Sequence, residues 1–409
     1  MSERYPGGFI TKTPPTPTGG ESGTASGMWN LQDVLENVKS STWPTPPPPL
    51  RELYAWGNNN RGQLGINAFN PPLEGSSPVQ VGALTSWIGA EAGNTRNAVG
   101  LLRDGTVWSW GENNNGCSGQ NEPELVDRSS PTQIGTETFW AEISMRGTTC
   151  IAQTTSGNLY GWGKNTLGDI GDGSAVNRSS PVQIGALTNW AQFSAGINQT
   201  HAIKNDGTLW AWGNSFNGEL GDGTTVNKSS PVQIGSDTDW AFVSSGQGNV
   251  AAIKTDGTLY VWGTASNGEL GDNQSATNRS SPVQLGSDTD WAFVYFGGFA
   301  DRHAIKTDGS LYSWGLNNTG ASGLGDIIAR SSPVQVGALT NWSELSGHTA
   351  RLAVKTDGTM WSWGFNGDGQ QGQNDQVRRS SPVQVGSEVY WKRPRMHETA
   401  FAVVSDKNT

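Results

Sequence analysis

The dipeptide Trp-Gly recurs seven times at nearly even spacing, and this periodicity constrains the fold more than any other feature of the sequence. The steps between copies are 54, 52, 50, 50, 52 and 49 residues, and each copy continues as W-G-x4-G-x2-G. About 20 residues after each Trp stands Ser-Ser-Pro-x-Gln, and the Pro is followed by Gly four residues later and by a second Trp five residues after that Gly. The dipeptides begin at Trp56, Trp110, Trp162, Trp212, Trp262, Trp314 and Trp363.

Each unit also contains a pattern typical of a β-hairpin. The run "HAIKNDGTLWAWG", residues 201–213, has two β-rich stretches around Asp-Gly, which suits a tight turn. Six such hairpins accompany the seven Trp-Gly anchors. The C-terminal run "FAVVSDKNT" matches a first hairpin strand, and "ELYAWG", residues 52–57, matches a second strand that has no first strand before it. We therefore predict that both ends of the chain complete one shared unit, which removes a free sheet edge.

A period near 50 residues with about four short strands per unit predicts a β-propeller. We expect an all-β fold, a seven-bladed β-propeller over residues 51–409, closed by N- and C-terminal strands that share one blade. Seventeen of the 19 Trp fall at repeat positions, and we expect them in the core between blades rather than on a platform for sugars or bases. Residues 1–50 lack the repeat and are expected to form an extended N-terminal arm.

The arm contains one segment with the periodicity of a short amphipathic helix, over about residues 30–39. Four apolar residues fall at i, i+3, i+4 and i+7, and a Trp stands on either side of the helix. Such a short helix is not stable alone in water, so its apolar stripe needs a surface to cover. That surface is either the propeller of the same chain or another protein of a larger assembly. We favour the second and expect a partner anchor formed by Trp29, Leu31, Val34, Leu35, Val38 and Trp43.

Composition excludes some classes of partner. The 409 residues carry a net charge of −10, and nucleic-acid binding proteins rely on a basic surface, so we expect no nucleic acid as partner. No apolar run reaches the length of a membrane span, so we expect no membrane insertion. The start "MSERYPGGFI" lacks the pattern of a signal peptide. Cys117 and Cys150 fall at different repeat positions, which argues against a disulfide.

Several residues of catalytic or metal-binding type have a simpler interpretation. Glu219 and Glu269 share a repeat position and must lie one blade apart, which does not suit a pair of catalytic carboxylates. His201 and His303 also share a position, so they do not converge as metal ligands would. The run "GDGTTVN", residues 221–227, lacks the ligand pattern of a calcium loop and is interpreted as a turn. We expect no enzyme activity and no catalytic, cofactor-binding or metal-binding residues.

A basic residue precedes Ser-Ser-Pro in six of the seven units. Such a ring could bind a polyanion, but we favour a structural role in which each side chain bonds a carbonyl or carboxylate of a neighbouring blade. The basic cluster "WKRPR", residues 391–395, is expected to be a blade strand or loop. The six residues are Arg128, Arg178, Lys228, Arg279, Arg330 and Arg379.

The runs "DGTLYVWGTASNGELGDN", residues 256–273, and "NRSSPVQLG", residues 278–286, resemble the regulator of chromosome condensation repeat family. The resemblance covers residues 52–409 and implies a seven-bladed propeller with a shared closing blade. Exchange factors for small GTPases, ubiquitin-ligase scaffolds and a secreted β-lactamase inhibitor use this fold, so function must be argued from sites. An exchange factor of this family needs an inserted wedge on one face, and no repeat here carries an insertion of more than a few residues.

The N-terminal segment resembles a short module of bacteriophage virion proteins through "YPGGFI" and "GMWNLQDVLENVKSSTWP". This implies a non-enzymatic virion structural protein, a component of a tail, fibre or capsid surface that is assembled in the host cytoplasm. Its arm would bind other virion proteins, and its propeller would face a host-surface receptor. An alternative is a bacterial protein-binding propeller similar to the secreted β-lactamase inhibitor. A third interpretation is a guanine nucleotide exchange factor for a small GTPase.

Overall fold

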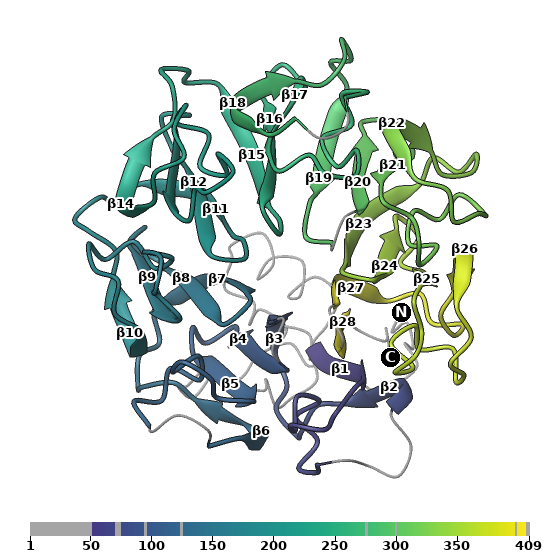
Figure 1. The fold of residues 1–409 in the computed structure, drawn as a ribbon. Coiled ribbons are helices and arrows are strands. Elements are labelled where there is room, and N and C mark those ends of the chain that lie inside the picture. The colour runs from purple at the N-terminus through teal and green to yellow at the C-terminus, as the bar shows by residue number, and fades with distance from the viewer. Residues whose placement is uncertain are drawn as a thin grey trace, which may run out of the picture. The chain divides into compact units, whose positions relative to one another are not determined.

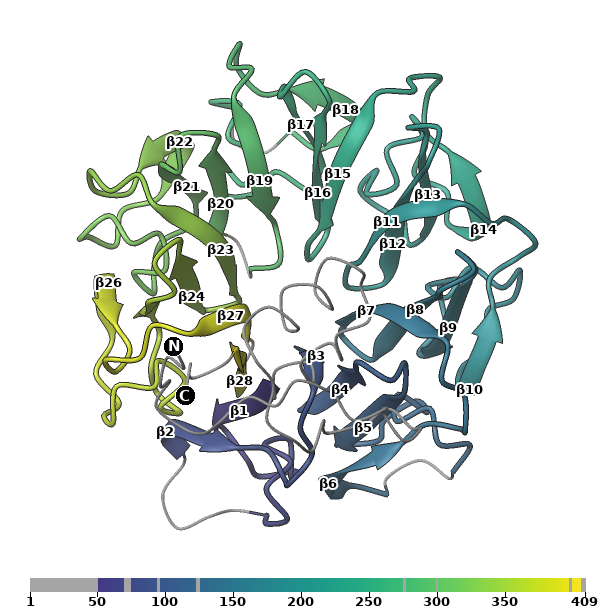
Figure 2. The ribbon, with the colours of Figure 1, turned by 180° about the vertical axis from the view of Figure 1, so that it is seen from behind.

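Twenty-eight strands form seven four-stranded antiparallel sheets, which stand as blades around a common centre (Figures 1 and 2). The predicted all-β, seven-bladed propeller is therefore confirmed. The part of the chain that is described holds no helix long and apolar enough to cross a membrane. The computed structural model describes residues 51–69, 75–93, 96–122, 126–274, 277–298, 301–396 and 399–405.

Each blade has the same order of strands, which we number from the centre outward. The first strand lines the centre of the ring and the fourth lies at its rim (Figure 1). The bounds are: blade 1, β3 (Trp87–Ala92), β4 (Asn97–Leu102), β5 (Val107–Gly111), β6 (Arg128–Gln133); blade 2, β7 (Trp140–Arg146), β8 (Thr149–Thr154), β9 (Leu159–Gly163), β10 (Arg178–Gln183); blade 3, β11 (Trp190–Ala195), β12 (Gln199–Lys204), β13 (Leu209–Gly213), β14 (Lys228–Gln233); blade 4, β15 (Trp240–Ser245), β16 (Asn249–Lys254), β17 (Leu259–Gly263), β18 (Arg279–Gln284); blade 5, β19 (Trp291–Tyr295), β20 (Asp301–Lys306), β21 (Leu311–Gly315), β22 (Arg330–Gln335); blade 6, β23 (Trp342–Gly347), β24 (Ala350–Lys355), β25 (Met360–Gly364), β26 (Arg379–Gln384); blade 7, β27 (Trp391–Met396), β28 (Thr399–Ser405), β1 (Arg51–Gly57), β2 (Gly75–Gln80).

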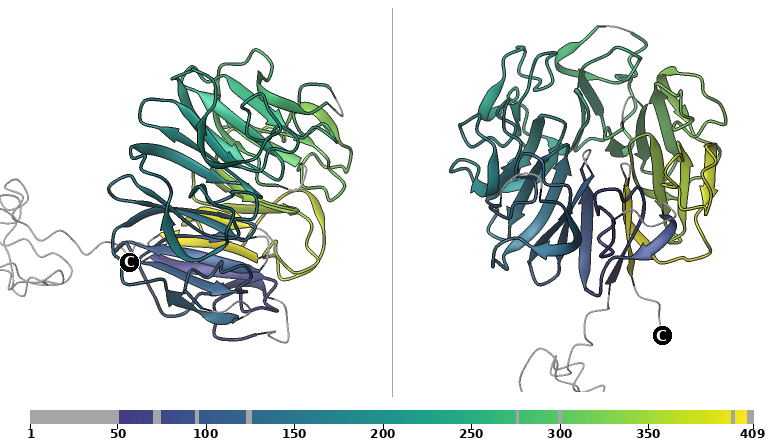
Figure 3. Two further views of the ribbon diagram at one scale, coloured as in Figure 1. Left: turned by 60° about the vertical axis from the view of Figure 1, so that its left-hand side comes forward. Right: turned by 60° about the horizontal axis from the view of Figure 1, so that its bottom comes forward.

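The two ends of the chain meet in blade 7. Strand β28 pairs with β1 along its whole length, from Arg51 opposite Ser405 to Gly57 opposite Thr399. Figure 3 shows these two strands, yellow and purple, side by side. The prediction of a shared closing blade is confirmed, and the pairing leaves neither terminal strand with an open hydrogen-bonding edge.

The hydrophobic core lies between neighbouring blades. One cluster, for example, joins Val261 and Leu270 of blade 4 to Trp291 and Trp314 of blade 5. The Trp of each Trp-Gly dipeptide is fully or almost fully buried, and the Trp262 indole N–H donates a hydrogen bond of 2.9 Å to the backbone oxygen of Glu219 in blade 3. Fourteen of the 17 repeat Trp are buried as predicted, whereas Trp108, Trp210 and Trp361 are only half-buried.

The glycines of the W-G-x4-G-x2-G motif allow the blades to approach closely. A Cβ at Gly218 would stand 2.5 Å from the Cα of Ser280 in the next blade, and one at Gly221 would stand 2.8 Å from Trp262 Nε1. Both residues have positive φ, where a side chain is also strained. The motif is therefore needed to seal one blade against the next.

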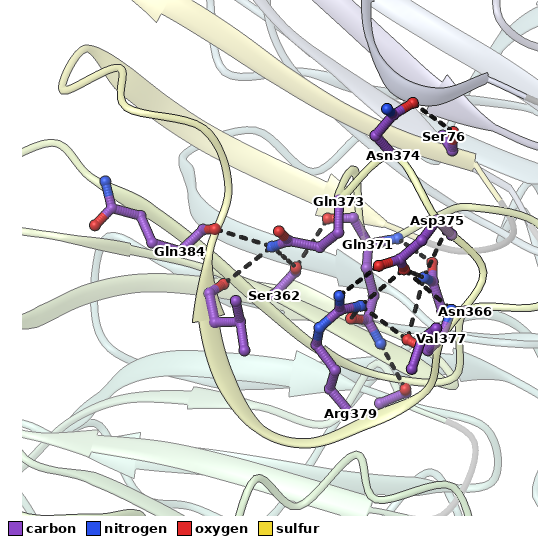
Figure 4. Close-up of polar contacts among 12 residues, drawn as sticks. Ser76, Ser362, Asn366, Gln371, Gln373, Asn374, Asp375, Val377, Arg379 and Gln384 are labelled. Atoms are coloured by element: carbon purple, nitrogen blue, oxygen red, sulfur yellow. Dashed lines mark hydrogen bonds and ion pairs between the residues drawn. The ribbon is translucent and has the colours of Figure 1, made fainter.

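We call the contact between two neighbouring blades a seam. In every seam a backbone hydrogen bond joins the loop that follows Trp-Gly in one blade to the Ser-Ser-Pro motif of the next. In the last seam, the N–H of Asn374 donates to the backbone oxygen of Ser76 at 2.8 Å, which ties blade 6 to blade 7. Figure 4 shows the side-chain bond between the same residues, in which the Ser76 hydroxyl donates to the amide oxygen of Asn374. The donor of the backbone bond stands 11 residues after the Trp of one blade, and the acceptor is the first Ser of Ser-Ser-Pro in the next. The other six pairs are Asn67 with Ser129, Asn121 with Ser179, Gly173 with Ser229, Gly223 with Ser280, Asn273 with Ser331, and Gly325 with Ser380.

The propeller has two different faces. We call one end of the propeller the turn face. At this end the hairpin turns between the second and third strands meet the loops that lead into the first strands. These elements touch across the seams, as where the N–H of Trp140 donates to the oxygen of Gly105 at 3.1 Å. We call the opposite end the long-loop face. At this end the Trp-Gly motifs continue into the loops between the third and fourth strands.

Candidate protein-binding face

The predicted partner anchor, formed by Trp29, Leu31, Val34, Leu35, Val38 and Trp43, lies outside the described residues, as does the predicted helix over about residues 30–39. The Glu, His and Cys residues considered above as catalytic or metal-binding candidates do lie in the described part of the chain, and they take part in the packing of the blades. Glu219 and Glu269 are buried in the loops of blades 3 and 4. Each carboxylate accepts a hydrogen bond from the backbone N–H two residues earlier, which for Glu219 is that of Asn217 at 2.7 Å. Their role in the structure is to cap these loops.

The two His at one repeat position are both buried. His201 Nδ1 lies 2.9 Å from Ser245 Oγ, and Nε2 lies 3.1 Å from the backbone oxygen of Glu219. Burial lowers the pKa of His201 to about 4, so the ring is neutral at pH 7. Cys117 and Cys150 are free thiols in the core. In the described ranges no three His, Cys, Asp or Glu side chains are grouped as metal ligands would be.

The basic residues before Ser-Ser-Pro are structural, but not in the way the repeat suggested. Each one forms an ion pair with a carboxylate from the loop of its own blade, not of a neighbouring blade. In blade 6, Arg379 Nη2 lies 2.6 Å from Asp375 Oδ2, and Asn366 supports the same carboxylate (Figure 4). The loop folds back on itself, which brings a carboxylate four to seven residues upstream beside the base. The other pairs are Arg128 with Glu122, Arg178 with Asp172, Lys228 with Asp222, Arg279 with Asp272, and Arg330 with Asp326.

The cluster "WKRPR" lies in β27, as predicted, and its Arg395 lines the central channel. This channel is a cavity of about 180 Å³ lined by the first strands of all seven blades. Serines brace part of its wall, as where Ser144 Oγ accepts a bond of 3.0 Å from the backbone N–H of Ala195 in the next blade. Arg395 replaces this serine in blade 7 and forms an ion pair of 2.6 Å with Glu91 of blade 1.

The charged groups in the channel largely satisfy one another. Arg146 of blade 2 reaches across to blade 5, where it donates to the backbone oxygen of Gly297 and to the hydroxyl of Tyr295. Glu142 stands in the wall without such a partner, and its pKa is raised by burial and by the nearby Glu91. Arg393 and Arg395 act in the opposite direction on this pKa without cancelling the rise, so the channel is a cross-braced polar centre of the ring.

Carboxylates gather on the turn face, and here they exceed the cations by far. The described turns and loops of this face carry eleven Asp and Glu but a single Lys or Arg, which is Arg103. Hydrogen bonds lower the pKa of four turn aspartates: Asp256 accepts bonds from the Thr258 side chain at 2.6 Å and backbone at 3.0 Å, and Asp206, Asp308 and Asp357 accept equivalent bonds. The eleven are Asp104, Glu137, Asp206, Asp237, Asp239, Asp256, Asp288, Asp290, Asp308, Asp357 and Glu388.

Four blades hold a lysine between aromatic rings beside these loops. In blade 4, Lys254 Nζ lies 5.0 Å from the ring centroid of Trp240 and 5.1 Å from that of Tyr260. It also pairs with Asp237 at 2.7 Å and Asp239 at 3.1 Å. Burial alone would lower the pKa of Lys254, but these carboxylates raise it. We call this arrangement a lysine box, and it recurs around Lys204, Lys306 and Lys355.

Sequence reasoning missed both the acidic face and the lysine boxes. A signal was present, because "SDTDW" occurs twice, at residues 236–240 and 287–291, and a Lys precedes the hairpin turn in four units. The strands had to be placed side by side before these residues could be seen as neighbours.

Comparison with known proteins identifies the repeat. The regulator of chromosome condensation (RCC1) repeat matches at residues 52–99, 156–203, 206–253 and 308–347, and a second form of it matches at residues 91–117. A stretch of 133 residues is 30% identical to the human E3 ubiquitin-protein ligase HERC2 and covers 30% of this chain but 2% of the ligase. Another of 126 residues is 29% identical to the mouse secretion-regulating guanine nucleotide exchange factor, and covers 29% of this chain and 27% of that protein. The matched part spans less than a third of either relative.

Solved structures show the same fold over most of the chain. Human WBSCR16 matches with a TM-score of 0.77 at 16% identity, over 87% of this chain and 99% of its own. Prp20p from Saccharomyces cerevisiae matches with a TM-score of 0.77 at 19% identity, over 89% of this chain and 93% of its own.

These relatives overturn the predicted bacteriophage virion function. That prediction rested on a short N-terminal resemblance, whereas the matches fall in the repeats and lead to RCC1-type proteins. The expected virion location and virion partners rest on the same N-terminal resemblance, which lies outside the described residues. The chain is a seven-bladed β-propeller that carries repeats of the regulator of chromosome condensation (RCC1) type at residues 52–117, 156–203, 206–253 and 308–347.

Proposed function

We propose that this chain is a non-enzymatic, RCC1-type binding propeller whose turn face holds a basic segment of a protein partner. The observation that carries the proposal is the charge of this face, where eleven carboxylates of the described turns and loops stand against Arg103 and the four lysines of the lysine boxes. The side chains of Asp237 and Asp288 are 52% and 53% exposed, although each pairs with a lysine of its own blade. A face of this kind attracts cationic segments over several ångströms and favours them over nucleic acid.

The long-loop face does not offer the same surface. Six of its loops carry an Asp or Glu that is paired with the Arg or Lys before Ser-Ser-Pro, so its charge is balanced locally. Support for a protein partner also comes from Prp20p, which has this fold and is described by its binding to Gsp1p and histones.

The proposal is tested with a fluorescein-labelled pentalysine peptide as probe and fluorescence anisotropy as readout. Asp237→Asn combined with Asp288→Asn removes two exposed charges from the turn face and should weaken binding several-fold at low salt. The matched control is Glu112→Gln combined with Asp368→Asn, which removes two charges from the long-loop face and should change the affinity little. Equal loss in both double variants, or no loss in either, contradicts a binding site on the turn face.

A further inference from the structure

The lysine boxes follow one plan in blades 3 to 6. The last residue of the second strand is Lys, the first residue of the first strand is Trp, and the third strand supplies Trp or Tyr. The ammonium group lies over the rings, at 3.5 Å from the centroid of Trp361 for Lys355 and at 4.2 Å from that of Trp210 for Lys204. In blades 4 and 5 two carboxylates of the loop before the first strand complete the box. The fold therefore builds a site for an ammonium group and fills it with its own lysine.

Blade 2 keeps the walls of this box but lacks the lysine. Trp140 and Tyr160 stand at 5.3 Å between centroids, close to the 5.1 Å of Trp240 and Tyr260 in blade 4. The lysine position is taken by Thr154, whose hydroxyl bonds Ser156 Oγ at 2.9 Å at its own turn. A threonine side chain is too short to extend over the rings as the lysines do.

The carboxylate of the box is also present in blade 2. Glu137 stands three residues before the first Trp, as Asp237 does in blade 4, and it is exposed. Phe139 takes the place of Asp239 and adds a third ring, 5.1 Å from Trp140 between centroids and 40% exposed. Glu137, Phe139, Trp140 and Tyr160 line a cavity of about 360 Å³ at the seam with blade 1.

In blade 1 an aliphatic side chain fills the place of the lysine. There the second strand ends in Leu102, an aliphatic residue that is buried against Trp87 and Trp110. The carboxylate is also absent, because Leu84 stands at the position of Glu137. Blade 2 thus combines the rings and the acid of the box with a threonine in place of the lysine, and the cavity lies beside them.

We propose that the cavity beside Trp140 and Tyr160 binds the ammonium group of a lysine side chain from a protein partner. This rests on the proposed function and names the residue type that the turn face recognises. The ammonium group takes the role of Lys254 in blade 4, against the faces of Trp140 and Tyr160 and beside the carboxylate of Glu137. A carboxylate or phosphate is repelled by Glu137, and an acetylated lysine has lost the charge that the rings and Glu137 attract.

The test fills the box of blade 2 with a side chain of the full-length protein itself. Thr154→Lys gives blade 2 the residue that blades 3 to 6 carry, and Thr154→Leu gives it the residue of blade 1. Both should fold, as judged by an unchanged or higher melting temperature, and each should weaken binding of labelled pentalysine at least fivefold. Ala338→Lys is the matched control, because it adds the same charge at an exposed position of the turn face in blade 6, away from Asp237, Asp288 and the box of blade 2, and should weaken binding less than twofold.

A gain of binding is expected from the reverse change in blade 4. Lys254→Thr opens a box that keeps Trp240, Tyr260, Asp237 and Asp239, and should raise the number of pentalysine peptides bound at saturation. A peptide of five acetyl-lysines should bind neither protein. If both Thr154 variants bind pentalysine as the natural chain does, while Asp237→Asn with Asp288→Asn still weakens binding, the lysine site in blade 2 is wrong and the acidic binding face stands. If none of these variants weakens binding, both proposals fail.

Discussion

Arg146 in blade 2 donates a hydrogen bond of 2.9 Å to the hydroxyl of Tyr295 in blade 5, across the central channel. The same guanidinium bonds the backbone oxygen of Gly297 and lies 5.7 Å from the centroid of the tyrosine ring. Blades of a propeller otherwise touch only their two neighbours, so this contact joins parts of the ring that the repeat itself does not join. The contact also holds blades 2 and 5 together at the centre of the ring.

Arg146→Met should lower the free energy of unfolding by about 1–3 kcal/mol, because it leaves the backbone oxygen of Gly297 without this donor and removes one of two donors to the Tyr295 hydroxyl, the other being Ser346. Burial alone raises the pKa of Tyr295, but Arg146 and the bonds to neighbouring groups lower it overall. The variant should therefore raise the pKa of Tyr295, which an ultraviolet titration compared with that of Tyr295→Phe measures. An unchanged tyrosine titration would show that the two side chains do not interact in solution.

Closure predicts a sharp difference between two C-terminal truncations. Removal of residues 401–409 takes away five residues of β28, including Phe401, which is buried against Trp110 of blade 1. The ring then loses a strand of its closing blade, and the chain should unfold or aggregate. Removal of residues 406–409 spares every residue of β28 and should leave the melting temperature within about 2 °C. Calorimetry of the two truncated chains checks this, and equal stability of both would contradict the shared blade.

Gly221→Ala should destabilise the protein far more than Gly235→Ala. Both residues have positive φ, at +83° and +62°, so each substitution costs about 1 kcal/mol of backbone strain. A Cβ at Gly221 would also meet the indole of Trp262 at 2.8 Å, whereas Gly235 has nothing within 4 Å. The additional overpacking should cost about 1–3 kcal/mol, measured by urea unfolding. A difference below about 0.5 kcal/mol would mean that the seam can shift to accept the methyl group.

The fold followed from the repeat because each blade constrains the next. The segment that contains Trp56 has no first hairpin strand before it, and the C-terminal run is a first hairpin strand with no second strand after it. Pairing these two segments completes the seventh unit. The ion pairs of the long loops were predicted with the wrong partner, because the path of a loop decides whether Arg379 meets Asp375 of its own blade. The periodicity carries no information on that path.

The functional face was out of reach for a different reason. A lysine box needs Trp240, Lys254 and Tyr260 to lie on one side of a sheet, and they are separated by turns whose register the sequence leaves open. The predicted function relied instead on residues 1–50, which carry none of the repeat. The information that bears on the family lay in residues 52–347, where the RCC1 matches fall.

Asp169 offers a test of how the loop caps work. It stands at the repeat position of Gln63, Glu219 and Gln370, where a side-chain oxygen accepts the backbone N–H two residues earlier, at 2.8 Å for Gln63. Aspartate is one methylene shorter, and both carboxylate oxygens of Asp169 are buried without a hydrogen-bond partner. Burial raises its pKa to about 7, against 3.8 for an exposed aspartate.

Asp169→Gln should therefore stabilise the protein, and the gain should depend on pH. A carboxyl with a raised folded pKa is harder to ionise in the folded than in the unfolded chain. Its penalty is absent below about pH 4, grows between pH 4 and 7, and is constant above pH 7. The substitution should raise the free energy of unfolding by about 2–4 kcal/mol at pH 8 and by much less at pH 5. Urea unfolding at both pH values measures this difference. Glu219→Gln is the control for the substitution itself, because that side chain already has its hydrogen bonds, and it should give no comparable gain in stability. A gain for Asp169→Gln that is equal at both pH values would show that the carboxylate is not the source of the penalty.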